Sequence, residues 1–488
     1  MFIGREDQLN DLKALCQKKT SSLVTCRGRR RIGKSTLIAE FARQTKARLI
    51  RLEGLRPSGA YSNATELTAF HDQLAAQSNR KQSIPKNWTE AFVQLDRCIR
   101  DKERTVVLLD EISWFGHFDK TFADTIKVCW DNYWKRHDKL IVVLCGSVSS
   151  WIRENIVDNS SFLGRRSLDL IVRELPLAQC VAFWGKKADR LATREIIDVL
   201  SVTGGIPRYL EEINPSLTAA ENIKRLCFTP NGILRTDFED MFNDVITHQR
   251  SFADRVLRSL LDGPRTISEI SASLSTERGG RVTDTINRLV ESGFVAADAG
   301  KDPETGKDLA RLRYRLKDNY ARFFLKYIDP VKTMIDNGRY AFASLETLEN
   351  WNTILGLQFE NLIVNNYGEL IPHLHLGSVL LTSAAPYRKA AVPSRRQKGY
   401  KIDLLIQSRR TIYIVEIKRK SEIDRSIIAE VDEKARRLRR NHDVSIKTAL
   451  VYAGTLAPIV EADGYFDAIV PVETILGLPA RGNRPTAN

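Results

Sequence analysis

The chain has 488 residues, of which 43% are hydrophobic and 28% charged. This composition is typical of globular domains in water, and at about 150 residues per domain the length predicts three or four of them. No apolar run reaches the roughly 20 residues that span a bilayer. We therefore expect a cytoplasmic protein that has no membrane contact.

The charge balance indicates the kind of partner. Lys and Arg number 75 and Asp and Glu 60, which gives a formal charge of +15. Such an excess favours a polyanion such as nucleic acid, although a basic surface can also serve solubility alone. The seven cysteines are scattered and never form a Cys-x-x-Cys. This pattern is typical of reduced, buried thiols and excludes a disulfide or zinc framework.

Residues 22–42 predict an apolar strand, a loop bounded by glycines and an amphipathic helix. The loop from Gly28 to Ser35 fits G-x-x-x-x-G-K-[ST], in which backbone N–H groups and a helix N-terminus cradle phosphates. In that pattern Lys34 contacts the β- and γ-phosphates of ATP, and Ser35 binds Mg²⁺. We expect six residues to contact the nucleotide: Gly28, Arg31, Gly33, Lys34, Ser35 and Thr36. For the loop arginines, a role as solvated charges is the alternative.

Two further strands end in polar residues of the kind that such a loop needs. The segment TVVLLDE is an apolar strand that ends in Asp110 and Glu111. Asp110 would hold Mg²⁺, and Glu111 would position or deprotonate the attacking water. The segment LIVVLCGSV ends at Ser147, which would sense the γ-phosphate or simply cap its strand.

The segments FIGREDQLNDL, GRRRIGKS, LLDE, LCGS and GGIPRYL together resemble the archaeal-type P-loop ATPases of the STAND and AAA+ group. The resemblance implies that Arg5 lies near the adenine and that Pro207 of a helical lid covers the nucleotide. It also implies a nucleotide-dependent homo-oligomer, in which Arg165 or Arg166 acts as an arginine finger on a neighbouring subunit. Alternatively, Pro207 only begins a helix and the two arginines lie on the surface.

The pattern changes after residue 245. Residues 250–291 predict three helices, interrupted at Gly263-Pro264 and Gly279-Gly280, and a segment up to residue 316 follows them. This order resembles a winged helix, which places its third helix in a major groove or serves only as a packing module.

A predicted hairpin at residues 401–420, KIDLLIQSRRTIYIVEIKRK, carries two carboxylates and a lysine on apolar strands. Strand alternation puts Glu416 and Lys418 on one face, and an antiparallel pairing would bring Asp403 to Glu416. Two such carboxylates repel each other unless a divalent cation lies between them. Mg²⁺ suits Asp403, Glu416 and the carbonyl of Ile417, and Lys418 would position a water for attack on a phosphodiester.

This hairpin resembles the PD-(D/E)xK nucleases, in which the helix before it carries a further acid, here Glu360. The sequence departs from that family in two ways: Ile402 stands where proline is common, and no glutamine follows on the next helix. A nuclease-like domain that has lost its activity is therefore the alternative.

We expect an α/β protein in which a P-loop ATPase core is followed by a helical lid, a winged helix and a restriction-endonuclease-like domain. The predicted boundaries are 1–174, 175–245, 246–330 and 331–475, with a disordered tail at 476–488. The predicted function is an ATP- and Mg²⁺-dependent switch coupled to DNA cleavage. The alternative is a nucleotide-dependent DNA-binding or signalling ATPase whose last domain does not cut.

Overall fold

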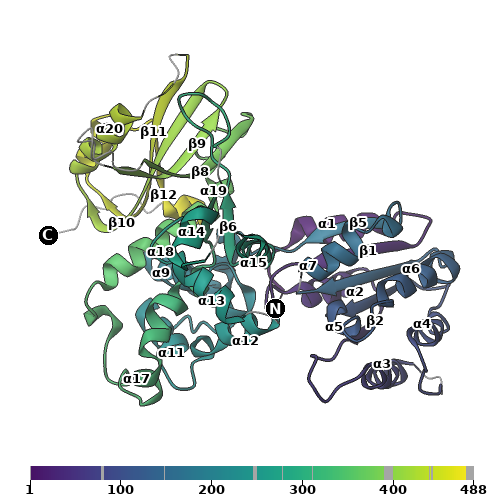
Figure 1. Cartoon of the computed structure of the whole chain (residues 1–488). Coiled ribbons are helices and arrows are strands. Elements are labelled where there is room, and N and C mark those ends of the chain that lie inside the picture. Colours follow the sequence, from purple (N-terminus) through teal and green to yellow (C-terminus); the bar gives the residue numbers. More distant parts are fainter. Residues whose placement is uncertain are drawn as a thin grey trace. The chain divides into compact units, whose positions relative to one another are not determined.

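The computed structural model describes residues 2–78, 82–147, 149–245, 250–276, 279–309, 312–389, 399–438, 440 and 443–479. The chain forms two compact units, Met1–Glu174 and Leu175–Asn488 (Figure 1). The first unit ends where the sequence analysis placed the end of the ATPase core. The finer division of the second unit remains a prediction.

A parallel five-stranded sheet forms the centre of the first unit, in the order β2-β3-β4-β1-β5. Its strands are β1 (Ser22–Arg27), β2 (Arg48–Glu53), β3 (Thr105–Asp110), β4 (Leu140–Gly146) and β5 (Arg166–Ile171). β3 and β4 are buried along their whole length, which explains their apolar sequences. Because β4 lies between β1 and β3, the carboxyl ends of these three strands meet at one edge of the sheet.

Two helices of the first unit begin at clear local signals. The side chains of Ser62 and Asn87 accept backbone N–H bonds at the starts of α3 and α4. Phe70, Trp88 and Phe122 pack edge to face in the core. The helices are α1 (Glu6–Leu15), α2 (Lys34–Gln44), α3 (Asn63–Gln77), α4 (Trp88–Asp96), α5 (Ile112–Phe115), α6 (Phe122–Asn132) and α7 (Ser149–Ile152), with short turns at Trp134–Arg136, Arg153–Val157 and Ser160–Phe162.

The second unit opens with a group of helices, as predicted for residues 175–245. α9 packs against α18 and buries Ile196, Ile197 and Leu200. The helices are α8 (Leu177–Cys180), a 3-10 segment at Val181–Arg190 that is broken at Gly185, α9 (Thr193–Thr203), α10 (Pro207–Leu210), α11 (Ala219–Cys227), a turn at Ile233–Arg235 and α12 (Asp237–Val245).

Three helices and a two-stranded antiparallel sheet come next. α15 buries Val282, Ile286 and Leu289, as the periodicity of the sequence predicts. The elements are α13 (Arg250–Ser259), α14 (Ile267–Ser273), α15 (Gly280–Glu291), β6 (Val295–Asp298) and β7 (Arg313–Leu316). A further helical stretch contains α16 (Asn319–Phe323), turns at Phe324–Ile328 and Asp329–Val331, α17 (Lys332–Asp336), a turn at Leu345–Thr347, α18 (Trp351–Asn365) and α19 (Tyr367–Leu370).

A mixed sheet ends the chain, in the order β12-β11-β10-β9-β8. β8 (Leu381–Lys389), β9 (Tyr400–Ser408) and β10 (Thr411–Ile423) are antiparallel neighbours, whereas β11 (Ser445–Leu456) and β12 (Ala468–Pro471) continue the sheet in parallel. α20 (Ser426–Arg437) connects β10 to β11, and α21 (Pro458–Ala462) and α22 (Val472–Ile475) follow. β9 and β10 form the predicted hairpin, with Val415 opposite Leu404.

Three further features concern the tail, the cysteines and the helices. The tail was predicted to be disordered from residue 476, but Leu476 is buried and its N–H donates to the Val472 carbonyl at 3.0 Å, so ordered structure continues past that boundary. Residues 480–488 lie outside the described residues. The seven cysteines are all free thiols, and only Cys16 is not fully buried. No helix in the described part of the chain is both long and apolar enough to cross a bilayer.

Candidate functional site

The predicted phosphate loop connects β1 to α2 and has the backbone that its glycines permit. Gly28 has φ +155°, and a Cβ there would lie 2.2 Å from the Val172 carbonyl oxygen, so no larger residue fits. Gly33, with φ 86°, precedes the first turn of α2. Lys34 is buried, and its Nζ donates to the carbonyls of Gly28 at 3.0 Å and Arg29 at 3.1 Å. The ammonium is thereby held over the loop that would receive the phosphates.

The two predicted Mg²⁺ ligands of this unit are in direct contact. The Ser35 hydroxyl donates to Asp110 Oδ2 at 2.5 Å. Arg51 of β2 donates to the same oxygen at 3.0 Å. The sequence analysis missed Arg51, because no motif singles out a residue on that strand. Asp110 itself is 3% exposed, so these two donors offset the cost of burying its charge.

Glu111 and Ser147 are brought together as well. Glu111 follows β3 in a left-handed conformation with φ 49°, which turns its side chain toward the end of β4. There, Glu111 Oε2 accepts hydrogen bonds from the Ser147 hydroxyl at 2.7 Å and the Ser147 N–H at 3.2 Å. The carboxylate predicted to activate water is therefore held by the residue predicted to sense the γ-phosphate.

The remaining predicted nucleotide contacts lie in different places. Arg5 is buried, and its Nη2 donates to the Ile32 carbonyl at 3.0 Å, which attaches the N-terminal segment to the phosphate loop. Arg31 lies in the loop with φ 67°, and Thr36 lies exposed in the first turn of α2. Pro207 begins α10 in the second unit, so its place over a nucleotide stays a prediction.

The two candidate finger arginines differ in their contacts. Arg165 is bound within its own unit: its Nε and Nη2 lie 3.0 and 2.9 Å from the Asp131 carboxylate, and its Nη1 donates to the Ser161 carbonyl at 2.7 Å. Arg166 begins β5, and its buried Nε has no hydrogen-bond partner among the described residues. Of the two, Arg165 is therefore the more firmly held by contacts within its own unit.

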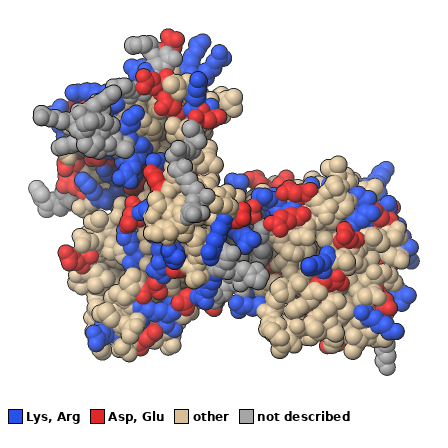
Figure 2. Space-filling model, viewed as in Figure 1, with Lys and Arg blue, Asp and Glu red and all other residues tan. Residues whose placement is uncertain are grey.

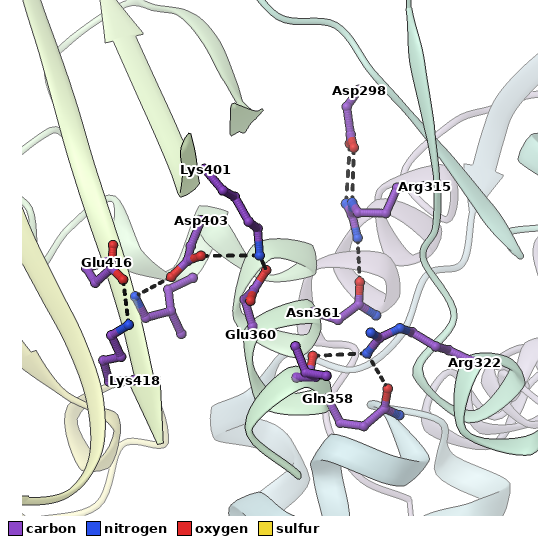
Figure 3. Close-up of polar contacts among 12 residues, drawn as sticks. Asp298, Arg315, Arg322, Gln358, Glu360, Asn361, Lys401, Asp403, Glu416 and Lys418 are labelled. Atoms are coloured by element: carbon purple, nitrogen blue, oxygen red, sulfur yellow. Dashed lines mark hydrogen bonds and ion pairs between the residues drawn. The ribbon is translucent and has the colours of Figure 1, made fainter. Parts of the chain in front are cut away.

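In the second unit the hairpin forms a buried polar centre (Figure 3). The β9–β10 register ends with Val415 opposite Leu404, and Glu416 and Asp403 are the next residues on their strands. Asp403 Oδ2 accepts the Ile417 N–H at 3.1 Å, and Lys418 Nζ lies 2.8 Å from Glu416 Oε1. The side chains of Asp403 and Glu416 are buried in a shared environment. The four residues predicted from this hairpin therefore meet at one place.

α20 adds a lysine that the sequence analysis did not include in the centre. Lys434 Nζ lies 2.8 and 2.7 Å from the two oxygens of Glu416. Lys434 and Lys418 each also contact Glu430 Oε1 at 3.0 Å. The spacing of Glu430 and Lys434 on one helix face, four residues apart, was the available signal.

α18 completes the centre from the other side of Asp403. Lys401 Nζ lies 3.3 Å from Asp403 Oδ1 and also contacts Glu360 Oε1 (Figure 3). Lys401 thus joins Glu360 to Asp403, and the role of Glu360 as an additional nuclease acid stays a prediction. Lys401 was not predicted, although it stands two residues before Asp403 on the same strand.

Burial and mutual repulsion perturb the acids of this centre. Burial, followed by the charge of Asp403, raises the pKa of Glu416 to about 7. The same two causes raise the pKa of Glu360. Burial alone would lower the pKa of Lys418, but the Glu416 carboxylate outweighs it and the pKa is raised. The centre therefore holds carboxylates that are costly to ionise without cations beside them.

The donor set fits a hard divalent cation that takes few ligands from the protein and keeps several waters. Within the described parts of the chain, no group of three or more His, Cys, Asp or Glu side chains is arranged to hold a metal ion. Asp403 and Glu416 supply two carboxylates, and the carbonyl of Ile417 is the third predicted ligand. Mg²⁺ commonly binds through one or two carboxylates and keeps several waters, so this number of ligands is sufficient.

The first unit thus has the parallel sheet, phosphate loop and acidic strand end that define a P-loop nucleoside triphosphatase core. Residues 2–213 match the model of a family described as an ATPase domain predominantly from Archaea. This part of the chain is therefore similar to archaeal ATPase domains. The match extends beyond the first unit and includes α9 and α10.

Similar proteins extend over more of the chain. An uncharacterized protein of Methanocaldococcus jannaschii is 21% identical over 435 residues, which cover 88% of this chain and 89% of the relative. The Walker-type ATPase of Pyrococcus abyssi has 16% identity and a TM-score of 0.47, covering 67% of this chain and 96% of its own. The ORC2 protein of Aeropyrum pernix has 13% identity and a TM-score of 0.41, with coverages of 68% and 91%.

Proposed function

We propose that the chain is an ATP-hydrolysing switch coupled to a Mg²⁺-dependent DNA nuclease. The observation that carries the nuclease part is the buried group of Asp403, Glu416 and Lys418, in which Lys418 Nζ lies 2.8 Å from Glu416. Two buried carboxylates lie together here, and lysine ammonium groups that a divalent cation can displace balance their charge. A strand pair that serves packing alone has no need to bury two acids side by side.

In the ATPase part, each residue has a role that follows from its contacts. Lys34 exchanges the carbonyls of the loop for phosphate oxygens when a nucleotide enters. Ser35 and Asp110 would hold the Mg²⁺ ion that binds together with ATP, and this ion would neutralise part of the phosphate charge. Glu111 orients the attacking water, and Ser147 fixes the direction of its carboxylate.

In the nuclease part, Asp403, Glu416 and the Ile417 carbonyl would hold Mg²⁺, which supplies a bound water as nucleophile and stabilises developing charge. Lys418 orients that water and offsets the charge on the attacked phosphate. Lys434 neutralises Glu416 while no metal is bound, and Glu430 gives its ammonium a second partner. Glu360 and Lys401 set the charge beside Asp403.

The region between these two parts supports DNA binding. α13 to α15 followed by β6 and β7 have the order of a winged helix. α15 exposes Arg281, Asp284, Asn287 and Arg288, a face that mixes donors with an acid. We propose that this domain contacts DNA. We also propose that the protein acts as a homo-oligomer, with Arg166 as the residue offered to a neighbouring subunit.

One buried ion pair supports coupling between the two activities. Arg419 of β10 follows Lys418 directly, and its Nε and Nη2 lie 2.5 and 2.6 Å from the carboxylate of Asp198. Asp198 is on α9, which belongs to the segment that matches the ATPase family. A shift of α9 would therefore be transmitted to the strand that carries Glu416 and Lys418.

A second candidate is a DNA-binding switch whose last domain does not cut. The observation that favours it is the occupation of Glu416, because Lys434 contacts both of its oxygens and Lys418 contacts one. An ion has to displace these ammonium groups before it can bind. If they cannot move, the centre is a structural ion-pair network.

The deciding experiment is cleavage of plasmid and linear DNA by the purified chain, with and without Mg²⁺ and ATP. Asp403→Asn and Glu416→Gln should abolish cleavage and leave ATP hydrolysis intact. Lys418→Ala should do the same, whereas Lys420→Ala, which removes an exposed lysine from the same strand, should leave cleavage unchanged. Cleavage that persists in a folded Glu416→Gln protein would exclude this centre. If the parent protein binds DNA but never cuts it, the second candidate is correct.

A further inference from the structure

A large cavity in the second unit has no role in the function proposed above. Its volume is about 780 Å³, within the range of ligand sites. Three parts of the unit line it: the β6–β7 hairpin and the turn after α13, one side of α18 together with the turn after α16, and the paired ends of β8 and β9. Figure 3 shows part of its wall, from Asp298 to Lys401.

The lining is strongly basic. Seven basic side chains line the cavity, against three acidic ones. Two of the acids are already paired, Asp298 with Arg315 and Glu360 with Lys401. Among the described residues, no carboxylate lies within ion-pairing distance of four of the cations, namely Arg322, Lys326, Arg388 and Lys389. On the visible face of each unit, by contrast, basic and acidic side chains are interspersed (Figure 2).

Arg322 is the most informative of these cations. Its Nη1 donates to the Gln358 side chain at 2.7 Å and to the Leu357 carbonyl at 3.1 Å (Figure 3). Both acceptors are neutral, and burial lowers the pKa of the guanidinium. The Glu360 carboxylate is close enough to favour the charged guanidinium but is itself paired with Lys401, so Arg322 has no ion-pair partner of its own among the described residues. Burying a cation in this way is costly, and one already oriented by fixed acceptors loses little entropy when an anion binds. The cavity is therefore prepared for an anionic ligand.

The cavity adjoins the hairpin centre. Glu360 and Lys401 belong to its lining, and Lys401 Nζ lies 3.3 Å from Asp403 Oδ1. A ligand with one anionic group at Arg322 and further groups in series would reach Asp403. Tyr387 and Tyr400 also line the cavity, with ring centroids 6.1 Å apart, and such rings stack on nucleobases without regard to sequence.

The size of the cavity limits the ligand further. A cube of this volume has an edge of about 9 Å, which is less than the roughly 12 Å width of the major groove alone. A duplex does not enter such a space, but a single strand of one to a few nucleotides does. Cations in series and aromatic rings beside them are the features that bind single strands; here both rings are half-buried, and the Arg437 guanidinium lies over the ring of Tyr400.

We propose that this basic cavity binds the phosphates and bases of one unpaired nucleic-acid strand and leads that strand to Asp403 and Glu416. The binding stands on the cavity alone, whereas the delivery for cleavage rests on the proposed nuclease function. A substrate that has an unpaired end would therefore be bound and cut in preference to a blunt duplex.

The test measures binding by the full chain without divalent metal, so that no cleavage occurs. A fluorescent oligothymidylate is titrated against the parent protein, Arg388→Gln/Lys389→Gln and, as a matched control, Lys186→Gln/Lys187→Gln. The control removes two adjacent exposed lysines elsewhere in the same unit. The cavity variant should bind about tenfold more weakly, and its log–log salt slope should fall by about 1.4, because two phosphate contacts are lost at about 0.7 each. Arg322→Gln, with an unchanged melting temperature, should weaken binding as well.

Three outcomes would overturn the proposal. The first is a control variant that loses as much oligothymidylate affinity as the cavity variant does. The second is a cavity variant whose affinity for a blunt duplex falls as much as its affinity for the single strand. The third is displacement of the oligonucleotide by thymidine 5′-monophosphate at similar molar concentration, which would identify a mononucleotide site. The two proposals fail separately. If the cavity variants lose strand binding as expected but the parent protein never cuts DNA, only the proposed nuclease function is refuted. If the protein cuts DNA but the cavity variants bind the single strand as the parent does, only the proposed strand binding in the cavity is refuted.

Discussion

Removing the carboxylate of Asp198 should destabilise the protein by about 3 kcal/mol. In Asp198→Asn, Arg419 keeps its charge in a site where its side chain is 2% exposed. Breaking a buried ion pair by removing one partner costs about 3–5 kcal/mol. We expect the lower end of that range for two reasons. Asn352 Oδ1 remains 3.4 Å from Arg419 Nη1, and a cavity of about 260 Å³ beside the pair gives water access.

Replacing both partners should reverse most of this loss. The double variant Asp198→Leu/Arg419→Met puts two apolar side chains where the ions were, and such replacements are often neutral or stabilising. Its melting temperature should approach that of the parent protein, while each single variant melts earlier. This variant should therefore fold yet lack the ion pair between α9 and β10, so it separates stability from coupling.

The assay for coupling is the ratio of DNA cleavage rates with and without ATP. In the double variant the ATP hydrolysis rate and the cleavage rate without ATP should stay near those of the parent, and the ratio should fall to about one. A ratio equal to that of the parent would refute the reasoning, because coupling would then bypass the ion pair. Loss of cleavage in both conditions would indicate damage to the neighbouring Lys418 instead.

Three further predictions concern the first unit. Lys34→Ala should abolish ATP binding, and Glu111→Gln should bind ATP but hydrolyse it about 10²–10⁴-fold more slowly, as measured by nucleotide binding and phosphate release. Burial raises the pKa of Glu66 to about 7, so the folded state binds this proton more tightly than the unfolded chain, and stability is lost as the pH rises from about 4.5 to 7. Glu66→Gln should therefore gain about 3 kcal/mol over the parent between pH 4 and pH 8 in urea unfolding; a constant difference would contradict this. Gly28→Ala places a Cβ 2.2 Å from the Val172 carbonyl and should weaken ATP binding and lower the melting temperature; unchanged values of both would show that the loop relaxes freely.

The residues that sequence could place are those in short, local patterns. The phosphate loop, Asp110 and Glu111 each lie at the end of an apolar strand, where parallel strands bring their carboxyl ends together. The pairing of Asp403 with Glu416 follows from a two-strand register, because the turn fixes which residues face each other. The hairpin spans only about twenty consecutive residues, and each strand of the first unit is recognised from its own short apolar run, so periodicity is enough to find each piece. The contact of Ser35 with Asp110 then follows from the parallel order of the strands.

Contacts between distant elements were not predictable in this way. Arg51 reaches Asp110, and Lys434 reaches Glu416, only after strands and helices pack in three dimensions. The ion pair of Asp198 and Arg419 joins residues 221 positions apart. The order of the tail at Leu476 depends on its burial, which its composition does not indicate.

Because six of the seven cysteines are buried, the rate at which each thiol is labelled can report how often the structure around it opens. A thiol reagent in solution can reach a buried sulfur only when the surrounding structure opens, so its labelling rate reports that opening. Burial also raises the pKa of Cys129 to about 11 and raises that of Cys227, which slows the reaction further. Cys129 lies in the first unit and Cys227 in the second. Their labelling rates, followed by mass spectrometry with and without ATP, would show which unit a bound nucleotide tightens.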